Sequence, residues 1–423
     1  MEKIVYAGTA CRSFVDASQV LKKLANIEAD EKQVERLTRA LGAERVAERA
    51  AMVKEFQKLA LPKKFAVPKD VQAPDLAVVM VDGGRIQIMD RAGVATAAST
   101  AAAVATEPLA TPENEDWEEE PADVKGHWRE DKVGLLMTMA STVAEQDPCP
   151  EIPQCFVDPT RIQRLVRELK KNVKQTEDAA GETEEPEVVE QALAEEVIYE
   201  PPELAKRQVV ASRCTWPNFA PILAAAAWQL GFQGAARKAF VGDGSKNNWV
   251  LHKRFFASFV AILDFIHALT YAFAGALADR KFADGWPIYT QWITWIWQGQ
   301  VTKVIAALAE RQAELGKPAK DESEASPRKV VDKALTYLRN HQDKMHYDEY
   351  RKAGLPITSS HMESMVKRVN LRVKGTEKFW SEEGGEAILQ LRADHLSDDQ
   401  PMDEFWQRRQ ANANGQRPRR KAG

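Results

Sequence analysis

The chain has 423 residues, 44% hydrophobic and 28% charged, which is long enough for two or three globular domains. Its four cysteines are too few and too scattered for a disulfide scaffold or a zinc ribbon. The N-terminal MEKIVYAGTACRS lacks the apolar core of a signal peptide, and the formal net charge of −4 is close to neutral for the chain as a whole.

The acidic residues are concentrated in two stretches. Residues 113–120 (ENEDWEEE) hold six of them and residues 177–203 hold eleven, with no basic residue in either stretch. Without these seventeen charges the remainder of the chain carries a net charge of +13. A basic body suits a polyanionic partner such as nucleic acid, although acidic stretches also simply keep a chain soluble.

Residues 13–59 are predicted to be helical. SFVDASQVLKKLAN is one amphipathic segment and EKQVERLTRALGAERVAERAAMVKEFQKL is another, and the IEAD between them resembles the turn of a helix-turn-helix. A plain helical hairpin that packs on the main domain explains the pattern equally well. In the DNA-binding interpretation the second segment is a recognition helix, with these side chains on its first turns: Lys32, Gln33, Arg36 and Arg39.

The next segments predict strands. Asp-Gly-Gly at 82–84 separates two alternating apolar runs, so residues 76–88 predict a β-hairpin. The stretch 92–123 has no periodicity and predicts a loop or disorder. KVGLLMTMA at 132–140 predicts another strand, and residues 159–171 predict a helix before the second acidic stretch.

The second half of the chain alternates between helices and strands. Its predicted elements are an apolar helix at 218–232, a short strand at 238–241, a helix at 247–256, a strand at 259–265, helices from 268 to about 350 and a last core helix at 360–374. The apolar run 255–278 is long enough for a membrane span, but Asp264 and His267 lie in its middle, which favours a buried strand and helix. This order predicts an α/β core with helices on its faces.

Three carboxylates stand out by position. Asp82 and Asp243 each end an apolar strand, and Glu363 opens the helix at 360–374. Taken singly, each has a structural explanation. The two aspartates each precede a glycine and suit a turn, and Glu363 follows Ser360 at capping-box spacing.

Taken together, the three carboxylates suggest a metal site. If their strands are neighbours, Asp82 and Asp243 emerge at the same region of the sheet and repel each other, and a divalent cation removes that repulsion. Mg²⁺ binds a few carboxylate oxygens together with water and phosphate, and two such ions can cleave a phosphodiester in line. On the helix, Met362, Val366 and Val369 form an apolar stripe that can pack on the sheet, beside a polar stripe with Glu363.

Several other residues are candidate DNA contacts. Basic side chains near the carboxylates are the first group: Lys246, Lys367, Arg368, Lys374 and Lys378. Tryptophans crowd the late helical segment and suit either base stacking or the core, and we expect at least two of the following in the core: Trp286, Trp292, Trp295 and Trp297. Residues 408–423 hold six basic and no acidic residues, which predicts a disordered tail that grips DNA nonspecifically.

At these residues the sequence resembles bacterial insertion-sequence transposases of the ISKra type, which are DDE transposases related to the Mutator group. The resemblance covers roughly residues 30–410. The matching segments are LAVVMVDGGRIQI, GHWREDKVGLL, AFVGDGSKNNW, LDFIHALTYAFAGAL, FADGWPIY through WQGQV, LTYLRNH, YDEYRKAGLPITSSHMESMVKRVN, RVKGTEKFW and EAILQLRADHLSDD.

The resemblance implies an RNase H-like mixed sheet flanked by helices, with Asp82, Asp243 and Glu363 as the catalytic, metal-binding triad. It implies Mg²⁺ or Mn²⁺, as two ions, and water followed by a DNA 3′-OH as nucleophiles. Asp264-Phe-Ile-His267 is similar to the (C/D)-x-x-H motif of Mutator-related transposases and makes Asp264 and His267 accessory residues. By chemistry alone, a satisfied and partly buried pair explains those two residues nearly as well.

We therefore expect a DNA transposase that cleaves and joins strands at the ends of its element. The partners are double-stranded DNA and further copies of the chain, with no membrane and no nucleotide cofactor, in the bacterial cytoplasm near the nucleoid. An RNase H-like nuclease and a noncatalytic DNA-binding protein derived from a transposase are the alternatives. The predicted regions are a helical N-terminal region (1–70), a catalytic core (71–267, with acidic inserts near 92–123 and 177–203), an all-helical insertion (268–352), the rest of the core (353–400) and a basic tail (401–423).

Overall fold

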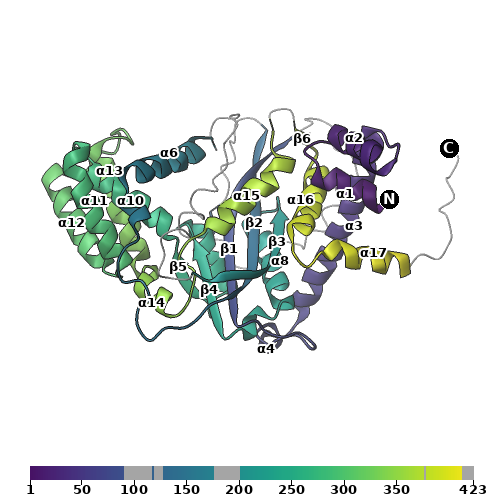
Figure 1. The fold of residues 1–423 in the computed structure, drawn as a ribbon, viewed down its shortest axis with the longest axis horizontal. Helices are drawn as coiled ribbons and strands as arrows, with labels where there is room; N and C mark the ends of the chain where they lie inside the picture. Colours follow the sequence, from purple (N-terminus) through teal and green to yellow (C-terminus); the bar gives the residue numbers. More distant parts are fainter. Residues whose placement is uncertain (90–116, 119–126, 176–200, 376–377, 412–423) are drawn as a thin grey trace.

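The structure is a computed structural model that describes residues 1–89, 117–118, 127–175, 201–375 and 378–411 (Figure 1). Within these residues the centre of the molecule is a six-stranded mixed sheet with the order β3-β2-β1-β4-β5 and with β6 beside the far end of β1. The strands are β1 (Leu76–Ile88), β2 (Trp128–Ala140), β3 (Glu203–Ser212), β4 (Arg237–Gly242), β5 (Val260–Leu263) and β6 (Phe379–Trp380).

Strand direction changes in the middle of the sheet. β2 runs antiparallel to both β1 and β3, whereas β4 runs parallel to β1 and β5 runs parallel to β4. β1 is buried on both faces, as expected of a central strand that carries a continuous apolar run. Leu76, Val78 and Met80 belong to one apolar core, and the alternate residues Ala77 and Val79 belong to another.

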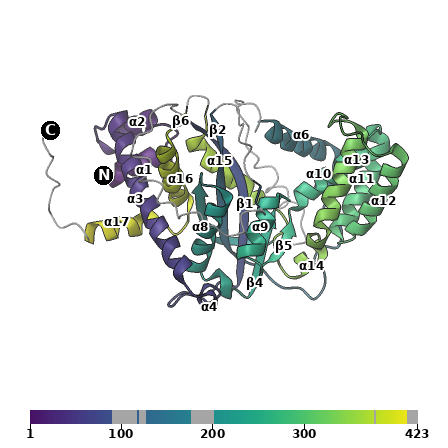
Figure 2. The ribbon, with the colours of Figure 1, turned by 180° about the vertical axis from the view of Figure 1, so that it is seen from behind.

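Helices cover both faces of this sheet. α15 (Ser360–Val373) and α16 (Glu382–Leu396) lie across one face (Figure 1). α8 (Trp216–Gln229) and α9 (Lys246–Phe255) lie over the other face, which is in front in Figure 2. The apolar stripe predicted on α15 is confirmed, because Met362 and Val369 are buried against the sheet and Val366 packs on the same core.

A group of helices lies beyond the β5 edge of the sheet, at the left of Figure 1. The chain segment between β5 and α15 consists of helices, as predicted: α10 (Phe265–Leu277), α11 (Phe282–Trp297), α12 (Val301–Leu315), α13 (Pro327–His341), the short 3-10 helix η4 (Gln342–Lys344) and α14 (Tyr347–Lys352). α6 (Pro159–Gln175) lies beside this group, preceded by the 3-10 helix η2 (Gln154–Phe156). A third 3-10 helix, η3 (Phe232–Gly234), follows α8.

The N-terminal helices lie at the opposite side of the sheet, together with the last helix of the described chain (Figure 1). They are α1 (Glu2–Ala10), α2 (Phe14–Ala25) and α3 (Glu31–Lys58), and the last helix is α17 (Pro401–Ala411). The short α4 (Leu61–Lys64) follows α3 and lies at the lower end of the sheet in Figure 1. The two helical segments predicted between residues 13 and 59 are therefore confirmed. α1 was not predicted.

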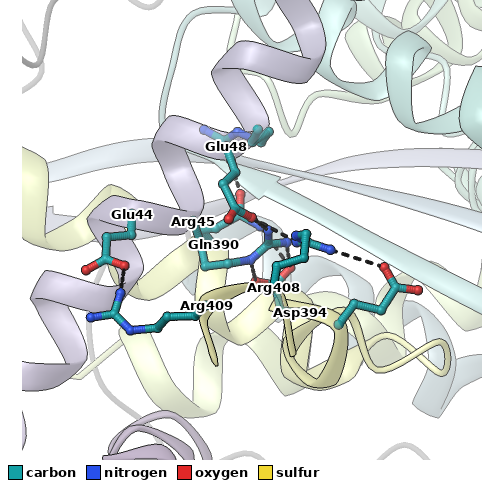
Figure 3. Close-up of polar contacts among 9 residues, drawn as sticks. Glu44, Arg45, Glu48, Gln390, Asp394, Arg408 and Arg409 are labelled. Carbon is teal, nitrogen blue, oxygen red and sulfur yellow. Dashed lines mark hydrogen bonds and ion pairs between the residues drawn. The ribbon is translucent and has the colours of Figure 1, made fainter. Parts of the chain in front are cut away.

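A buried ion pair attaches α3 to α16, and exposed ion pairs attach it to α17 (Figure 3). Arg45 on α3 grips Asp394 on α16 with two hydrogen bonds, Nε to Oδ2 at 2.9 Å and Nη2 to Oδ1 at 3.2 Å. On α17, Arg408 donates to Glu48 at 3.1 Å and Arg409 pairs with Glu44. The N-terminal helices are thus joined to the body by charge as well as by apolar contact.

The predicted hairpin at 76–88 is wrong. β1 passes through Asp82-Gly83-Gly84 without turning and pairs with β2 along its length, with Asp82 opposite Val133 and Gly84 opposite Asp131. The glycines serve close approach, since a Cβ placed on Gly84 would lie 2.7 Å from Oδ2 of Asp131. Neither glycine has the positive φ that a tight hairpin turn demands.

Other predictions need smaller corrections. β3 and α16 were not predicted. The predicted start of the basic tail at residue 401 is too early, because residues 401–411 form α17, in which Arg408 and Arg409 make ion pairs. Most of 92–123 and the whole of 176–200 lie outside the described residues. Within the first stretch, Trp117 has no regular secondary structure, as a loop residue would, and its side chain is buried in the core that includes α8 residues.

Candidate active site

The sheet places Asp82 and Asp243 side by side. β1 and β4 are adjacent parallel strands whose last paired residues are Met80 and Val241. Asp82 and Asp243 each lie two residues beyond that pair, so their side chains emerge at the same level of the sheet and on the same face. The expectation that the two strands are neighbours is confirmed.

Neutral groups hold both carboxylates. Oδ1 of Asp82 accepts a hydrogen bond from the backbone N–H of Gly83 at 2.7 Å. Oδ1 of Asp243 accepts from the backbone N–H of Ser245 and from the side-chain Nδ2 of Asn248, both at 2.9 Å. Hydrogen bonds of this kind fix a carboxylate in place without cancelling its charge.

Electrostatics brings Glu363 into the same site. Burial and, after it, the charges of Asp243 and Glu363 raise the pKa of Asp82 to about 7, against the opposing effects of the Gly83 N–H and His267. Glu363 lies in the first turn of α15, where the helix begins at Ser360 after the N-cap Ser359. The capping box proposed as the structural explanation for Glu363 is absent, since the N-cap is Ser359 and makes no side-chain capping bond.

The Asp264–His267 pair lies next to the carboxylates. Asp264 is fully buried, and its Oδ2 accepts from Nδ1 of His267 at 2.5 Å. Burial disfavours the charged imidazolium, but the bond to Asp264 and the charges of Asp264, Asp243 and Glu363 together raise the pKa of His267 to about 9. His267 is therefore a cation at neutral pH that faces the carboxylate cluster.

Asp264 also connects the sheet to the helix that carries Glu363. Its Oδ1 accepts from the backbone N–H of Ser359 at 2.9 Å, immediately before α15. The same carboxylate caps the N-terminus of α10. The satisfied, partly buried pair is confirmed, and the accessory role of Asp264 and His267 stays a prediction.

The predicted DNA contacts differ in their surroundings. Lys246 is exposed at the first position of α9, next to Asp243, whereas Lys367 and Arg368 are half-buried on α15. Lys374 lies over the ring of Trp128 at 5.6 Å, and burial lowers its pKa. Lys378 donates to the backbone carbonyls of residues 371 and 372 at the end of α15, which occupies its ammonium group.

The structure also shows the surroundings of the predicted recognition helix and of the clustered tryptophans. On α3, Lys32 and Arg36 are exposed, while Arg39 pairs with Glu35 at 2.6 Å. Trp292 and Trp297 are 4% and 1% exposed, which confirms that at least two of the clustered tryptophans are core residues. The half-buried Trp286 stacks on Phe282 with ring centroids 5.3 Å apart.

Two residues around Asp243 were missed by sequence reasoning. Asn248 follows Asp243 by five residues, and that short spacing into a helix was the only available signal. Tyr337 on α13 donates its hydroxyl to the backbone carbonyl of Asp243 at 2.7 Å. No local pattern reveals Tyr337, since 94 residues separate it from Asp243.

The donor set fits a hard divalent cation. Asp82, Asp243 and Glu363 offer oxygen atoms, and the raised pKa of Asp82 reflects burial and then repulsion by its neighbours, which Mg²⁺ or Mn²⁺ would relieve. Across the described residues, no three such side chains already converge in a metal-binding arrangement.

Comparison with known proteins adds no identification. No protein-family model matches the chain, and a search of curated proteins returns no match either. Among the described helices, none combines the length and the apolar character needed to cross a membrane.

Proposed function

We propose that this chain is a DDE-type DNA transposase with an RNase H-like core, which cleaves and joins strands at the ends of an insertion sequence. One observation carries the proposal: carboxylates from β1, from the end of β4 and from the first turn of α15 share one electrostatic environment. A buried carboxylate whose pKa is raised beside other carboxylates, as at Asp82, is typical of functional sites. The order of the sheet, an antiparallel β1-β2-β3 unit extended by parallel β4 and β5, supports the proposed core.

The residues have distinct roles in this proposal. Asp82, Asp243 and Glu363 hold the cations and orient the scissile phosphate between them. Divalent cations bound there, as a pair of Mg²⁺ or Mn²⁺ ions, would activate the attacking oxygen and stabilise charge on the leaving oxygen. His267 supplies a further positive charge beside the phosphate, and Asp264 keeps it protonated and oriented.

The proposed chemistry has two balanced steps. Water attacks a phosphodiester at the element end, the bond to the 3′ oxygen breaks, and a 3′-OH and a 5′-phosphate result. That 3′-OH then attacks a phosphodiester of target DNA, forms a new P–O bond and releases a target 3′-OH. Double-stranded DNA at two ends and in the target calls for a homo-oligomeric complex, acting in the bacterial cytoplasm at the nucleoid.

The basic surface supports a DNA substrate. Lys246 is exposed beside Asp243, and Lys367 lies one turn after Glu363 on α15, so positive groups flank the carboxylates where a DNA backbone would lie. Such contacts position the duplex without reading its sequence. Binding through them weakens as salt is raised.

A strand-transfer assay tests the proposal. Linear DNA that carries the sequences flanking the chain's own coding region is incubated with the protein, Mg²⁺ and a supercoiled target. We expect cleavage at the ends and joined products, and loss of both in Asp82→Ala. Cleavage without joining would instead favour an RNase H-like nuclease. DNA binding without cleavage, unchanged in Asp82→Ala, would favour a noncatalytic DNA-binding protein.

A further inference from the structure

The amide of Asn248 bridges the two strands that carry the aspartates. Its Nδ2 donates to Oδ1 of Asp243 at 2.9 Å and to the backbone carbonyl of Val81 at 3.3 Å. Val81 immediately precedes Asp82, so one side chain holds the Asp243 carboxylate and the backbone beside Asp82. Since both neighbours are acceptors, the amide must present its NH₂ group to them.

Burying the polar side chain of Asn248 costs free energy. The side chain is 2% exposed, and its Oδ1 is buried without a hydrogen-bond partner. An unpartnered buried acceptor costs free energy that an apolar residue would not. The two bonds made by Nδ2 therefore account for an amide at this position.

A second contact reaches Asp243 from the other side. The hydroxyl of Tyr337 on α13 donates to the Asp243 carbonyl at 2.7 Å, and its ring stacks on Tyr271 with centroids 3.7 Å apart. Gly244 has a φ of +96°, and a Cβ there would lie 2.7 Å from the Tyr337 ring. Burial raises the pKa of Tyr337 well above its ordinary value, so the hydroxyl remains a donor.

We propose that Asn248 and Tyr337 form a two-sided clamp that sets the position of Asp243 relative to Asp82, and that this clamp preorganises the carboxylates for a divalent cation. The inference rests on the proposed function, and it makes the helical segment after β5 a part of the site through α13. Both residues act through Asp243 and are positioning residues. Because both are uncharged, they hold the carboxylate and leave its charge available to the cation.

Asn247 and Tyr289 provide matched controls. Asn247 is the neighbouring buried asparagine on α9, and its amide exchanges two hydrogen bonds with the backbone of Glu118, at 2.8 and 3.1 Å, instead of with Asp243. Tyr289 is a buried tyrosine of the same helical segment whose hydroxyl donates to the carbonyl of Phe156 at 2.9 Å. Each control loses bonds similar to those lost by its test variant, away from the carboxylates.

The test is calorimetric titration of the full-length protein with MnCl₂, after circular dichroism and thermal unfolding show that each variant is folded. We expect Asn248→Ala to weaken Mn²⁺ binding roughly 10–100-fold, as is typical when a group that supports a metal ligand is removed. We expect a loss of roughly 10-fold or less for Tyr337→Phe, which deletes only a hydroxyl. Asn247→Ala and Tyr289→Phe should bind as the wild type does.

Two outcomes separate the clamp from the proposed function. If the wild type binds Mn²⁺ and both test variants bind it no more weakly than their controls, the clamp is overturned and the cation site stands. If the wild type binds no Mn²⁺, the proposed function is overturned and the clamp with it.

Discussion

Charged side chains are buried in two regions, the α3–α16 interface and the candidate site, and their surroundings differ. Where α3 meets α16, guanidinium groups face carboxylates: Arg45 faces Asp394 (Figure 3) and Arg49 faces Glu386. At the candidate site, Asp82 and Asp243 face neutral donors and each other. Buried charges that are paired join elements, whereas a cluster of three carboxylates beside a single imidazolium is typical of a functional site.

The largest expected effect is on catalysis. Asp82→Asn keeps the shape of the side chain and removes its charge, so we expect DNA cleavage in Mg²⁺ to fall at least about 100-fold, beyond the loss typical of a residue that only supports a ligand. The metal-free protein should be no less stable, because the burial and repulsion that raise the pKa of Asp82 are removed. Gel-based cleavage and thermal unfolding measure the two quantities.

Asp131→Asn is the matched control for that variant. Burial raises the pKa of Asp131 to about 7, as it does for Asp82, but the charged groups around Asp131 are Lys132, Glu130 and Lys374 rather than the other two carboxylates of the site. Cleavage by Asp131→Asn should equal that of the wild type. If both variants lost DNA cleavage equally, Asp82 would behave as any other buried carboxyl does, and the proposed site would be contradicted.

The next effect is on stability at the α3–α16 interface. Asp394→Ala leaves Arg45 buried without its bidentate partner, and the side chains of Arg45 and Asp394 are only 12% and 5% exposed. We expect the free energy of unfolding to fall by about 3 kcal/mol, with cleavage per folded molecule unchanged. Urea unfolding measures the loss. A loss below about 1 kcal/mol would show that this pair behaves as an exposed one.

A smaller effect depends on pH. Asp131 is fully buried, neither of its carboxylate oxygens has a partner, and its pKa rises from 3.8 to about 7. The folded protein therefore holds this proton more tightly than the unfolded chain. The stability that the proton contributes is complete below about pH 4 and is lost as the pH rises through about 7.

The Asp131→Asn variant lacks this titration. Relative to the wild type, its free energy of unfolding should shift by about 1–3 kcal/mol in the variant's favour between pH 4 and pH 8. Urea unfolding of both proteins at the two pH values measures the shift. A shift of the opposite sign would mean that Asp131 is ionised and paired in the folded protein.

The smallest effect is expected at the rim of the α3 interface. Arg409 and Glu44 form an ion pair whose side chains are 38% and 44% exposed, so Arg409→Ala should cost less than about 1 kcal/mol. The cost should shrink further in high salt. Urea unfolding at low and high salt measures it, and a loss as large as that of Asp394→Ala would erase the difference between rim and centre.

The sequence predicted that the strands of Asp82 and Asp243 are neighbours, but it did not predict the course of the strand that carries Asp82. Asp82 and Asp243 were identified because each ends an apolar run, and that signal is local. The hairpin at 82–84 was wrong because Asp-Gly has the same local pattern in a turn and in an extended strand. Only the pairing of Gly84 with Asp131 on β2, a tertiary contact, decides between them.

The elements that were missed lack the periodicity on which prediction rests. β3 is exposed or half-buried over most of its length, and only Val209 to Ser212 are buried. α16 is buried on nearly all sides and hides charged residues such as Asp394 and Arg392, so no polar face marks it as a helix. Tyr337 reaches Asp243 only after α13 has folded against the core.

The central claim is that Asp82, Asp243 and Glu363 together bind the divalent cation that DNA cleavage requires. Anomalous diffraction from crystals of the protein soaked in Mn²⁺ tests it most directly. We predict anomalous density within coordination distance of an oxygen from each of the three side chains, and none there in crystals of Asp82→Asn. Mn²⁺ density bound elsewhere, with the three carboxylates left apart, would contradict the account.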